Sequence, residues 1–372
     1  MHCCKSNQID CNLKTISKFN SYKKITSNKK LFDQNCKLMF CKKCNFFKKE
    51  INNDYKKNIK KIYKSYTKLH SDRFYQEVDQ IKAYKPKKYR AEITLEKLEK
   101  KLSILKYNNY LDYGCGLGAI SNALIKNKIS GKKIYCFDKI NILHKNIRKK
   151  INTFYKDRKS IKKKFDVIYL NHVLEHVFQP EEEIIFLKKI MNEKGLLVIQ
   201  IPNIDLGSSL YDLFIYDHAY HFTKKSFISF FSRFYFNLVY FDTKLIPGNI
   251  IGVFKKSKKK LKKHKINNNN TVKFDKFFSK INQLFIEMKN YKTLFFYGAS
   301  LITLFYCSNF KNKKIIIFDD NKNIREKYNK NIKIYHSSKI KNYQNITLFS
   351  SINKKIFRNL DAFKTNNRFK FL

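Results

Sequence analysis

The feature that most restricts the fold is a glycine turn between an apolar run and a helical pattern. Residues 112–118 read DYGCGLG, after an apolar stretch that ends at Leu111 and before the helix-forming residues 119–126. Glycine has no Cβ atom, so three alternating glycines allow a sharp turn and a close approach of the backbone to a ligand. Glycine turns also simply join a strand to a helix, so the neighbouring segments decide between the two interpretations.

Short apolar runs alternate with helical stretches from about residue 107 onward. This rhythm predicts an α/β fold with a doubly wound parallel sheet. The third strand is expected to be short or irregular, because mostly charged residues separate the second and fourth strands. The candidate strands are 107–112, 133–137, 165–170, 195–201, 235–241 and 249–254.

The net charge of +50 could indicate a polyanionic partner. Lysine supplies nearly all of it and only eight residues are arginine, in a composition that resembles an A+T-rich coding sequence. Specific phosphate and base readers favour arginine, so the composition argues against nucleic acid as the main substrate. The chain has no run of about eighteen apolar residues and no signal peptide near Met1, which predicts a cytoplasmic protein without a membrane span.

Two further segments extend the pattern set by the glycine turn. Asp138 follows the second candidate strand, where a carboxylate can accept hydrogen bonds from both ribose hydroxyls, although Asp138 could also be a helix N-cap. Residues 165–177 read FDVIYLNHVLEHV and residues 197–203 read LVIQIPN. In this order and spacing, residues 107–255 resemble the class I methyltransferases that use S-adenosylmethionine (SAM).

The resemblance implies a seven-stranded sheet with SAM lying over the glycine turn. In such a site Asp138 would bind the ribose, Asn171 would lie near the sulfonium, and Asp112 would steer the methionine amino group. Glu175 and His176 are expected mainly to hold the junction after the fourth strand. The implied cofactor-binding residues are Asp112, Gly114, Gly116, Gly118, Asp138 and Asn171.

Cysteines are concentrated at the start of the chain. Six of the nine lie in the first 44 residues, and residues 41–44 form a C-x-x-C pair. Four thiolates suit a tetrahedral structural zinc site, although two incidental thiols would give the same pair. The predicted ligands are Cys3, Cys4, Cys41 and Cys44.

A cysteine-pair module, a SAM domain and a second Rossmann-like unit, in this order, resemble the three-part sugar C-methyltransferases, which act on nucleotide-linked ketosugars. In that family a carboxylate-histidine pair downstream of the PN strand serves the chemistry, and residues 215–223 read IYDHAYHFT here. Carbon methylation beside a ketone needs a base, and imidazole titrates near neutrality. The resemblance therefore implies catalytic roles for His218, Asp217 and Tyr216. His218 and His221 could instead only bridge the loop to a helix capped by Thr223.

The resemblance divides the chain into five parts. They are a zinc-binding module at 1–50, a helical segment covering the active site at 51–105, the methyltransferase domain at 106–255, a Lys/Asn-rich linker at 256–272 and a Rossmann-like domain at 273–372.

Two rival functions stay open. One is an O- or N-methyltransferase acting on another small molecule or on RNA, although Asn171 lacks the following Pro-Pro-aromatic of enzymes that methylate exocyclic amines. The other is a non-catalytic scaffold with the same fold. The sequence leaves the oligomeric state undetermined.

Overall fold

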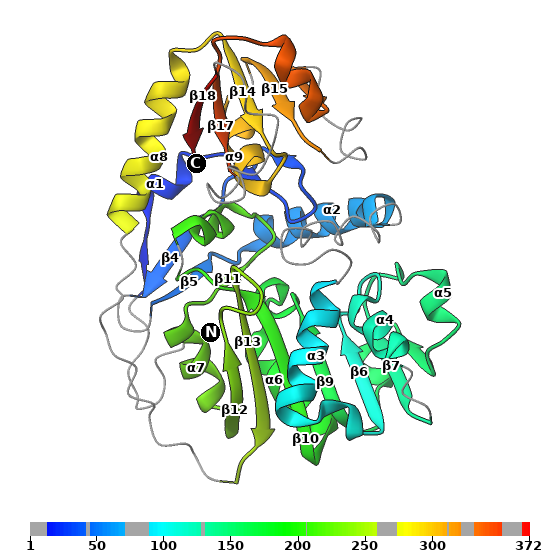
Figure 1. Cartoon of the computed structure of the whole chain (residues 1–372). Helices are drawn as coiled ribbons and strands as arrows, with labels where there is room; N and C mark the ends of the chain where they lie inside the picture. The colour runs from blue at the N-terminus through cyan, green and yellow to red at the C-terminus, as the bar shows by residue number, and fades with distance from the viewer. Residues whose placement is uncertain are drawn as a thin grey trace. The chain divides into compact units, whose positions relative to one another are not determined.

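The computed structural model describes residues 13–41, 45–70, 89–127, 131–205, 207–258, 274–310, 312–320, 331–351 and 367–372 (Figure 1). The chain divides into two compact units, each of which draws on separated segments. Unit 1 comprises residues 1–16, 38–209 and 218–271, and unit 2 comprises residues 17–37, 210–217 and 272–372. The described residues of the predicted N-terminal module are therefore shared between the two units.

Unit 1 is built on a seven-stranded sheet in the order β12-β13-β10-β9-β6-β7-β8. Five strands, β10, β9, β6, β7 and β8, run parallel to one another. The strand β13 runs antiparallel to both of its neighbours, β10 and β12. The sheet is therefore mixed rather than wholly parallel. The strands are β6 (Asn109–Tyr113), β7 (Lys133–Phe137), β8 (Thr153–Tyr155), β9 (Phe165–Asn171), β10 (Met191–Pro202), β12 (Phe236–Asp242) and β13 (Asn249–Lys256).

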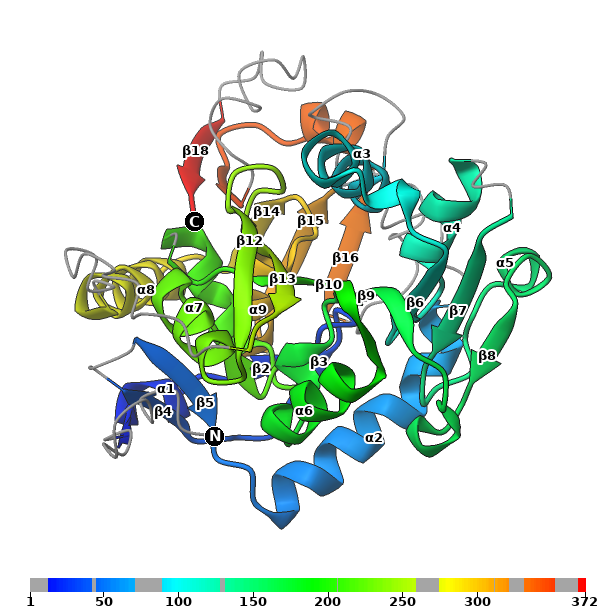
Figure 2. The same ribbon diagram turned by 90° about the horizontal axis from the view of Figure 1, so that it is seen from below.

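All six candidate strands of the sequence are confirmed, and the third strand, β8, has three residues, as expected. Helices cover both faces of the sheet (Figure 2). One face carries α3 (Arg90–Leu102) and α4 (Ala119–Lys126), and the other carries α6 (Pro180–Ile190) and α7 (Lys224–Ser232). Further helical turns of unit 1 are α5 (Lys145–Arg148), η2 (Ile104–Lys106), η3 (Arg158–Ser160) and η4 (Leu174–His176), and η5 (Gly207–Phe214) begins in unit 1 and continues in unit 2.

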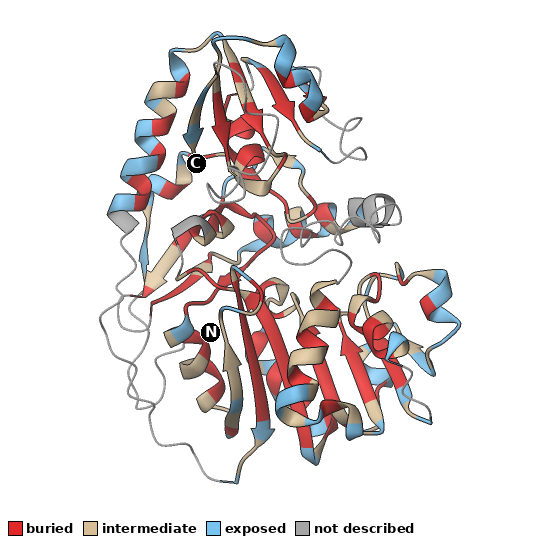
Figure 3. Cartoon of the chain, in the orientation of Figure 1, coloured by how far each residue is buried: buried red, intermediate tan, exposed pale blue. Residues whose placement is uncertain are grey.

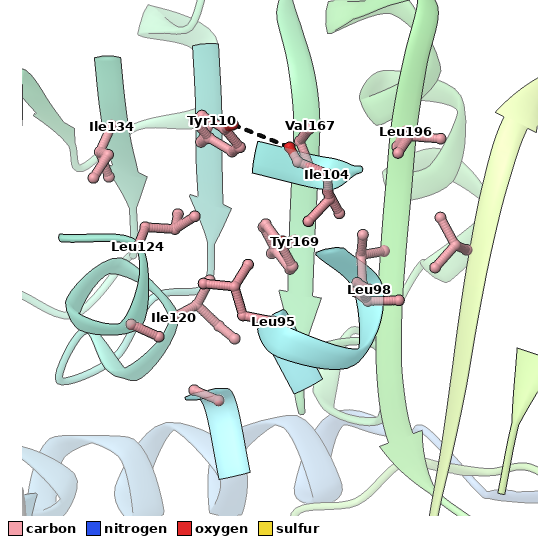
Figure 4. Close-up of a cluster of buried hydrophobic side chains, with 14 residues drawn as sticks. Leu95, Leu98, Ile104, Tyr110, Ile120, Leu124, Ile134, Val167, Tyr169 and Leu196 are labelled. Atoms are coloured by element: carbon pink, nitrogen blue, oxygen red, sulfur yellow. Dashed lines mark hydrogen bonds between the residues drawn. The ribbon is translucent and has the colours of Figure 1, made fainter. Parts of the chain in front are cut away.

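The first face is closed by an apolar cluster between α3, α4 and the strands (Figure 4). Leu95 and Leu98 from α3 and Leu124 from α4 are buried in this cluster. Tyr110 also belongs to it and donates its hydroxyl to the Ile104 carbonyl over 3.0 Å, so its polar end is satisfied within the core. This packing fixes the β6 to α4 junction, where the glycine turn lies.

The N-terminal segment of unit 1 joins a second sheet of antiparallel strands in the order β1-β4-β5-β11. Phe46 on β5 is buried, and its ring lies 5.5 Å from the ring of Phe222. The segment therefore shares a core with residues far along the chain, which its own apolar pattern did not indicate. The elements are β1 (Leu13–Thr15), β4 (Leu38–Cys41), β5 (Phe46–Lys49), β11 (Tyr220–His221) and the following helix α2 (Asn53–His70).

Unit 2 has a five-stranded parallel sheet in the order β16-β15-β14-β17-β18. In both units the buried residues are concentrated in the strands (Figure 3). The elements of unit 2 are α1 (Ser17–Asn20), β2 (Lys24–Ile25), β3 (Leu31–Phe32), α8 (Phe274–Lys289), β14 (Thr293–Tyr297), α9 (Leu301–Asn309), β15 (Lys314–Phe318), β16 (Ile332–Tyr335), η7 (Ser337–Asn342), β17 (Thr347–Ser350) and β18 (Arg368–Phe371). Among the helices that the structure describes, none combines the length and apolarity needed to cross a membrane.

Candidate active site

The three glycines of the turn after β6 have different surroundings. All three have positive φ, but a Cβ atom on Gly114 would lie 2.4 Å from Val173 Cγ2, and one on Gly118 would lie 2.6 Å from Leu143 Cδ1. A Cβ atom on Gly116 would meet no atom of the described residues within 4 Å, apart from its chain neighbours. Gly114 and Gly118 are therefore required for packing inside the protein, whereas Gly116 borders open space into which a ligand can fit.

Asp138 lies directly after β7 and is bonded to the same turn. Its Oδ2 accepts the Gly116 N–H over 2.8 Å, and its Oδ1 accepts the Ile140 N–H over 2.8 Å. Burial raises the pKa of Asp138 against the lowering effect of these bonds. Helix α5 begins only at Lys145 and is capped by His144, so the interpretation of Asp138 as a helix N-cap is wrong.

Asp112 holds the glycine turn from the strand side. Its Oδ2 accepts both the N–H of Ser121, over 3.1 Å, and the Ser121 hydroxyl, over 2.7 Å. Burial outweighs these bonds and raises the pKa of Asp112 to about 6. The bonds tie β6 to α4, while contact of Asp112 with a methionine amino group stays a prediction.

Asn171 is the last residue of β9, next to β6 in the sheet. Its Oδ1 is buried and has no hydrogen-bond partner among the described residues. A buried acceptor without a partner is costly, so its presence at the sheet edge favours a ligand that carries a donor or a positive charge.

These residues meet at one edge because β7, β6 and β9 are adjacent parallel strands whose carboxyl ends coincide. The edge offers an open backbone at Gly116, a carboxylate at Asp138 and an amide oxygen at Asn171. These groups fit SAM, whose ribose hydroxyls are donors and whose methionine part carries positive charge.

Histidines surround a buried carboxylate in the segment after β9. Glu175 is 1% exposed, and its Oε1 lies 3.0 Å from Nδ1 of His172. Burial opposes ionisation of Glu175, but the hydrogen bond and the charges of His172, His176 and His218 together hold its pKa below the ordinary value. The surroundings of Glu175 therefore favour its ionised form.

His218 belongs to this cluster. It is 6% exposed, and its ring stands edge-on to that of His176 with 4.6 Å between centroids. The N–H of the next residue, Ala219, donates to the Glu175 carbonyl over 2.8 Å. The ring of His221, on β11, lies farther away, at 6.2 Å. Sequence reasoning assigned Glu175 and His176 to the strand junction and missed their proximity to His218, which depends on a contact over about forty residues.

Asp217 and Tyr216 are anchored within unit 2. The Asp217 carboxylate accepts the Ser27 N–H over 2.8 Å and also the Ser27 hydroxyl. Tyr216 donates its N–H to the Ile25 carbonyl over 2.6 Å, and its ring lies 4.5 Å from that of Phe32. These contacts fix the backbone just before His218, and direct roles for the two side chains stay predictions.

Of the predicted zinc ligands, the structure describes Cys41, which is buried at the end of β4. Cys3, Cys4 and Cys44 lie outside the described residues. The zinc site therefore stays a prediction.

Comparison with known proteins gives a family match for the central region. Residues 80–240 match the family model of a methyltransferase domain. Similar solved structures include mitomycin 7-O-methyltransferase, with 13% identity and a TM-score of 0.38 over 45% of this chain and 53% of that chain. Another is a SAM-dependent methyltransferase from Clostridium acetobutylicum, with 12% identity and a TM-score of 0.38 over 50% of this chain and 97% of that chain.

Magnesium protoporphyrin IX methyltransferase from Synechocystis, solved with bound SAH, has 18% identity and a TM-score of 0.37 over 45% of this chain and 84% of that chain. The chain thus spans about half the length of the first of these structures. No match to a curated protein was found. The family match, together with the geometry around Gly116 and Asp138, supports a SAM-dependent methyltransferase domain in residues 80–240.

Proposed function

We propose that this enzyme transfers the methyl group of SAM to a carbon atom of a nucleotide-linked ketosugar, in deoxysugar or surface-polysaccharide biosynthesis. The observation that carries the proposal is the cluster of Glu175, His176 and His218, in which Glu175 and His218 are buried and His176 is half-buried. Glu175 and His176 come shortly after β9, whose last residue is Asn171. Transfer to oxygen needs only a weak base, whereas a carbon beside a ketone must first lose a proton. A histidine whose neighbouring groups fix which ring nitrogen carries the proton suits that step.

Different residues bind the cofactor and remove the proton. Gly116, Asp138 and Asn171 bind and orient the cofactor, which supplies an electrophilic methyl group when bound. A ring nitrogen of His218 takes the proton from the carbon beside the ketone, and the electron pair of that C–H bond forms the enolate. Burial of His218 would keep water away from the enolate.

Product analysis tests the proposal. The enzyme would be incubated with SAM labelled with ¹³C at the methyl group and with a nucleoside-diphosphate ketosugar. The matched control is the same nucleotide sugar with the ketone reduced to an alcohol. We expect a new C-methyl signal by NMR with the ketone only. An O-methyl signal with either sugar, or transfer only to added RNA, would assign the enzyme to one of the rival classes.

Replacement of Asp138 by alanine should weaken SAM binding about tenfold to a hundredfold. The variant removes a charged acceptor, and hydrogen bonds to charged groups contribute about 1.5–3 kcal/mol. Isothermal titration calorimetry with SAM measures the change. Asp319→Ala is the matched control, because Asp319 accepts the Ala299 N–H over 2.7 Å in the same arrangement after β15. Equal affinity in wild type and Asp138→Ala would remove Asp138 from the site.

We also propose one structural zinc bound by Cys3, Cys4, Cys41 and Cys44. Metal analysis after gentle purification should find about one zinc per chain, because four thiolates form a closed tetrahedral site. Cys44→Ser should lose the metal, whereas Cys307→Ser, at a buried position in α9, should keep it. A zinc content well below one per chain in the wild type would contradict the proposal.

A further inference from the structure

We propose that Glu175 is the positioning residue for His218, a role that rests on the proposed function. The assignment starts from the backbone. The Ala219 N–H donates to the carbonyl of Glu175 itself over 2.8 Å, and pairing of β11 with β5 holds the next residues in place. The peptide that follows His218 is therefore fixed directly against the residue that carries the carboxylate.

The side chains converge at the same point. One carboxylate oxygen of Glu175 and one ring nitrogen from each of His176 and His218 lie within 4.8 Å of one another. Hydrogen bonds of catalytic groups are often long without substrate and tighten when the complex forms.

The carboxylate also has capacity for a further donor. Its Oε1 contacts Nδ1 of His172, whereas its Oε2 is buried and lacks a hydrogen-bond partner among the described residues. A buried ionised oxygen in this state is costly, and an imidazole N–H is the donor that the cluster offers. A carboxylate in this position fixes which ring nitrogen carries the proton and stabilises the imidazolium that forms.

Asp217 and Glu175 thus have separate tasks. Asp217 receives both the N–H and the hydroxyl of Ser27, which anchors the loop. Glu175 lies beside the imidazole rings. The family motif implies a role for the residue directly before the histidine, while the geometry points to one about forty residues earlier.

Ring-nitrogen NMR of the full chain, saturated with S-adenosylhomocysteine, tests this assignment without an acceptor. Glu175→Gln keeps the size of the side chain and removes its charge. The His218 signals would be assigned by their loss in His218→Gln. We expect one dominant His218 tautomer in the wild type and a mixed tautomer population in Glu175→Gln. Glu182→Gln, which changes an exposed carboxylate on α6, should give the wild-type spectrum.

An unchanged His218 tautomer in folded Glu175→Gln would overturn the assignment. So would a shift seen in Asp217→Asn but not in Glu175→Gln. Stoichiometric Co²⁺ binding with visible bands that Glu175→Gln abolishes would also overturn it, since the cluster would then be a metal site. If Glu175→Gln fails to fold, Glu175→Asp retracts the charge by one methylene, and an unaltered tautomer there would count against the proposal. Because the readout needs no methyl transfer, its failure is separable from failure of the carbon-methylation proposal.

Discussion

Gly116→Ala is expected to weaken SAM binding by about a hundredfold while leaving the protein folded. The added methyl group would point into the open space beside the turn, where none of the described residues beyond the chain neighbours has an atom within 4 Å. In the proposed complex the cofactor would occupy that space, and overpacking of one methyl group typically costs about 1–3 kcal/mol. Calorimetry with SAM measures the loss, and thermal unfolding measures the stability.

Gly131→Ala is the matched control for this prediction. Gly131 also has a positive φ, +72° against +50° at Gly116, and a Cβ atom there would again meet no atom of the described residues within 4 Å, its chain neighbours aside. It lies just before β7, at the opposite edge of the sheet from the glycine turn. Both variants therefore carry a similar backbone cost of about 1–2 kcal/mol, but only Gly116→Ala should affect the cofactor. Equal SAM affinities in the two variants would show that the cofactor does not approach Gly116.

Gly114→Ala separates packing from binding at the same turn. Its Cβ atom would lie 2.4 Å from Val173 Cγ2, so the first effect should be on stability, by roughly 1–3 kcal/mol. The sequence places Gly114, Gly116 and Gly118 in one motif and gives each the same role. The structure distinguishes them because their neighbours, Val173 and Leu143, come from other segments of the chain.

Contacts between distant segments of the chain also limited the prediction of the fold. Apolar runs and turn residues predicted the strands of the large sheet, because a buried strand consists mostly of apolar residues that are visible in its own sequence. The antiparallel direction of β13 and the pairing of β5 with β11 were not predictable in this way, since pairing depends on contacts between distant segments. The position of Asp138 after β7 was predictable from local order. The proximity of Glu175 to His218 was not.

Substitution of His218 by glutamine should slow proton removal from the carbon beside the ketone by about a hundredfold or more, because general base catalysis typically contributes 10² to 10⁴. The measurement is deuterium uptake at that carbon in D₂O, followed by NMR, with ketosugar and S-adenosylhomocysteine bound so that no methyl group is transferred. SAM affinity should be unchanged, since Gly116 and Asp138 are intact. His336→Gln, which alters the cap of η7 in unit 2, is the control and should exchange at the wild-type rate.

The exchange rate isolates the step that distinguishes the proposed chemistry from its rivals. Methyl transfer to oxygen requires no carbon acid, so an O-methyltransferase would show no deuterium uptake in any variant. Uptake in the wild type that is lost in His218→Gln would assign the base, because His218 is buried beside an ionised carboxylate that can stabilise the imidazolium formed. Normal uptake in His218→Gln would instead make His218 structural and assign proton removal to another group, with His176, 4.6 Å away between ring centroids, as the first to substitute.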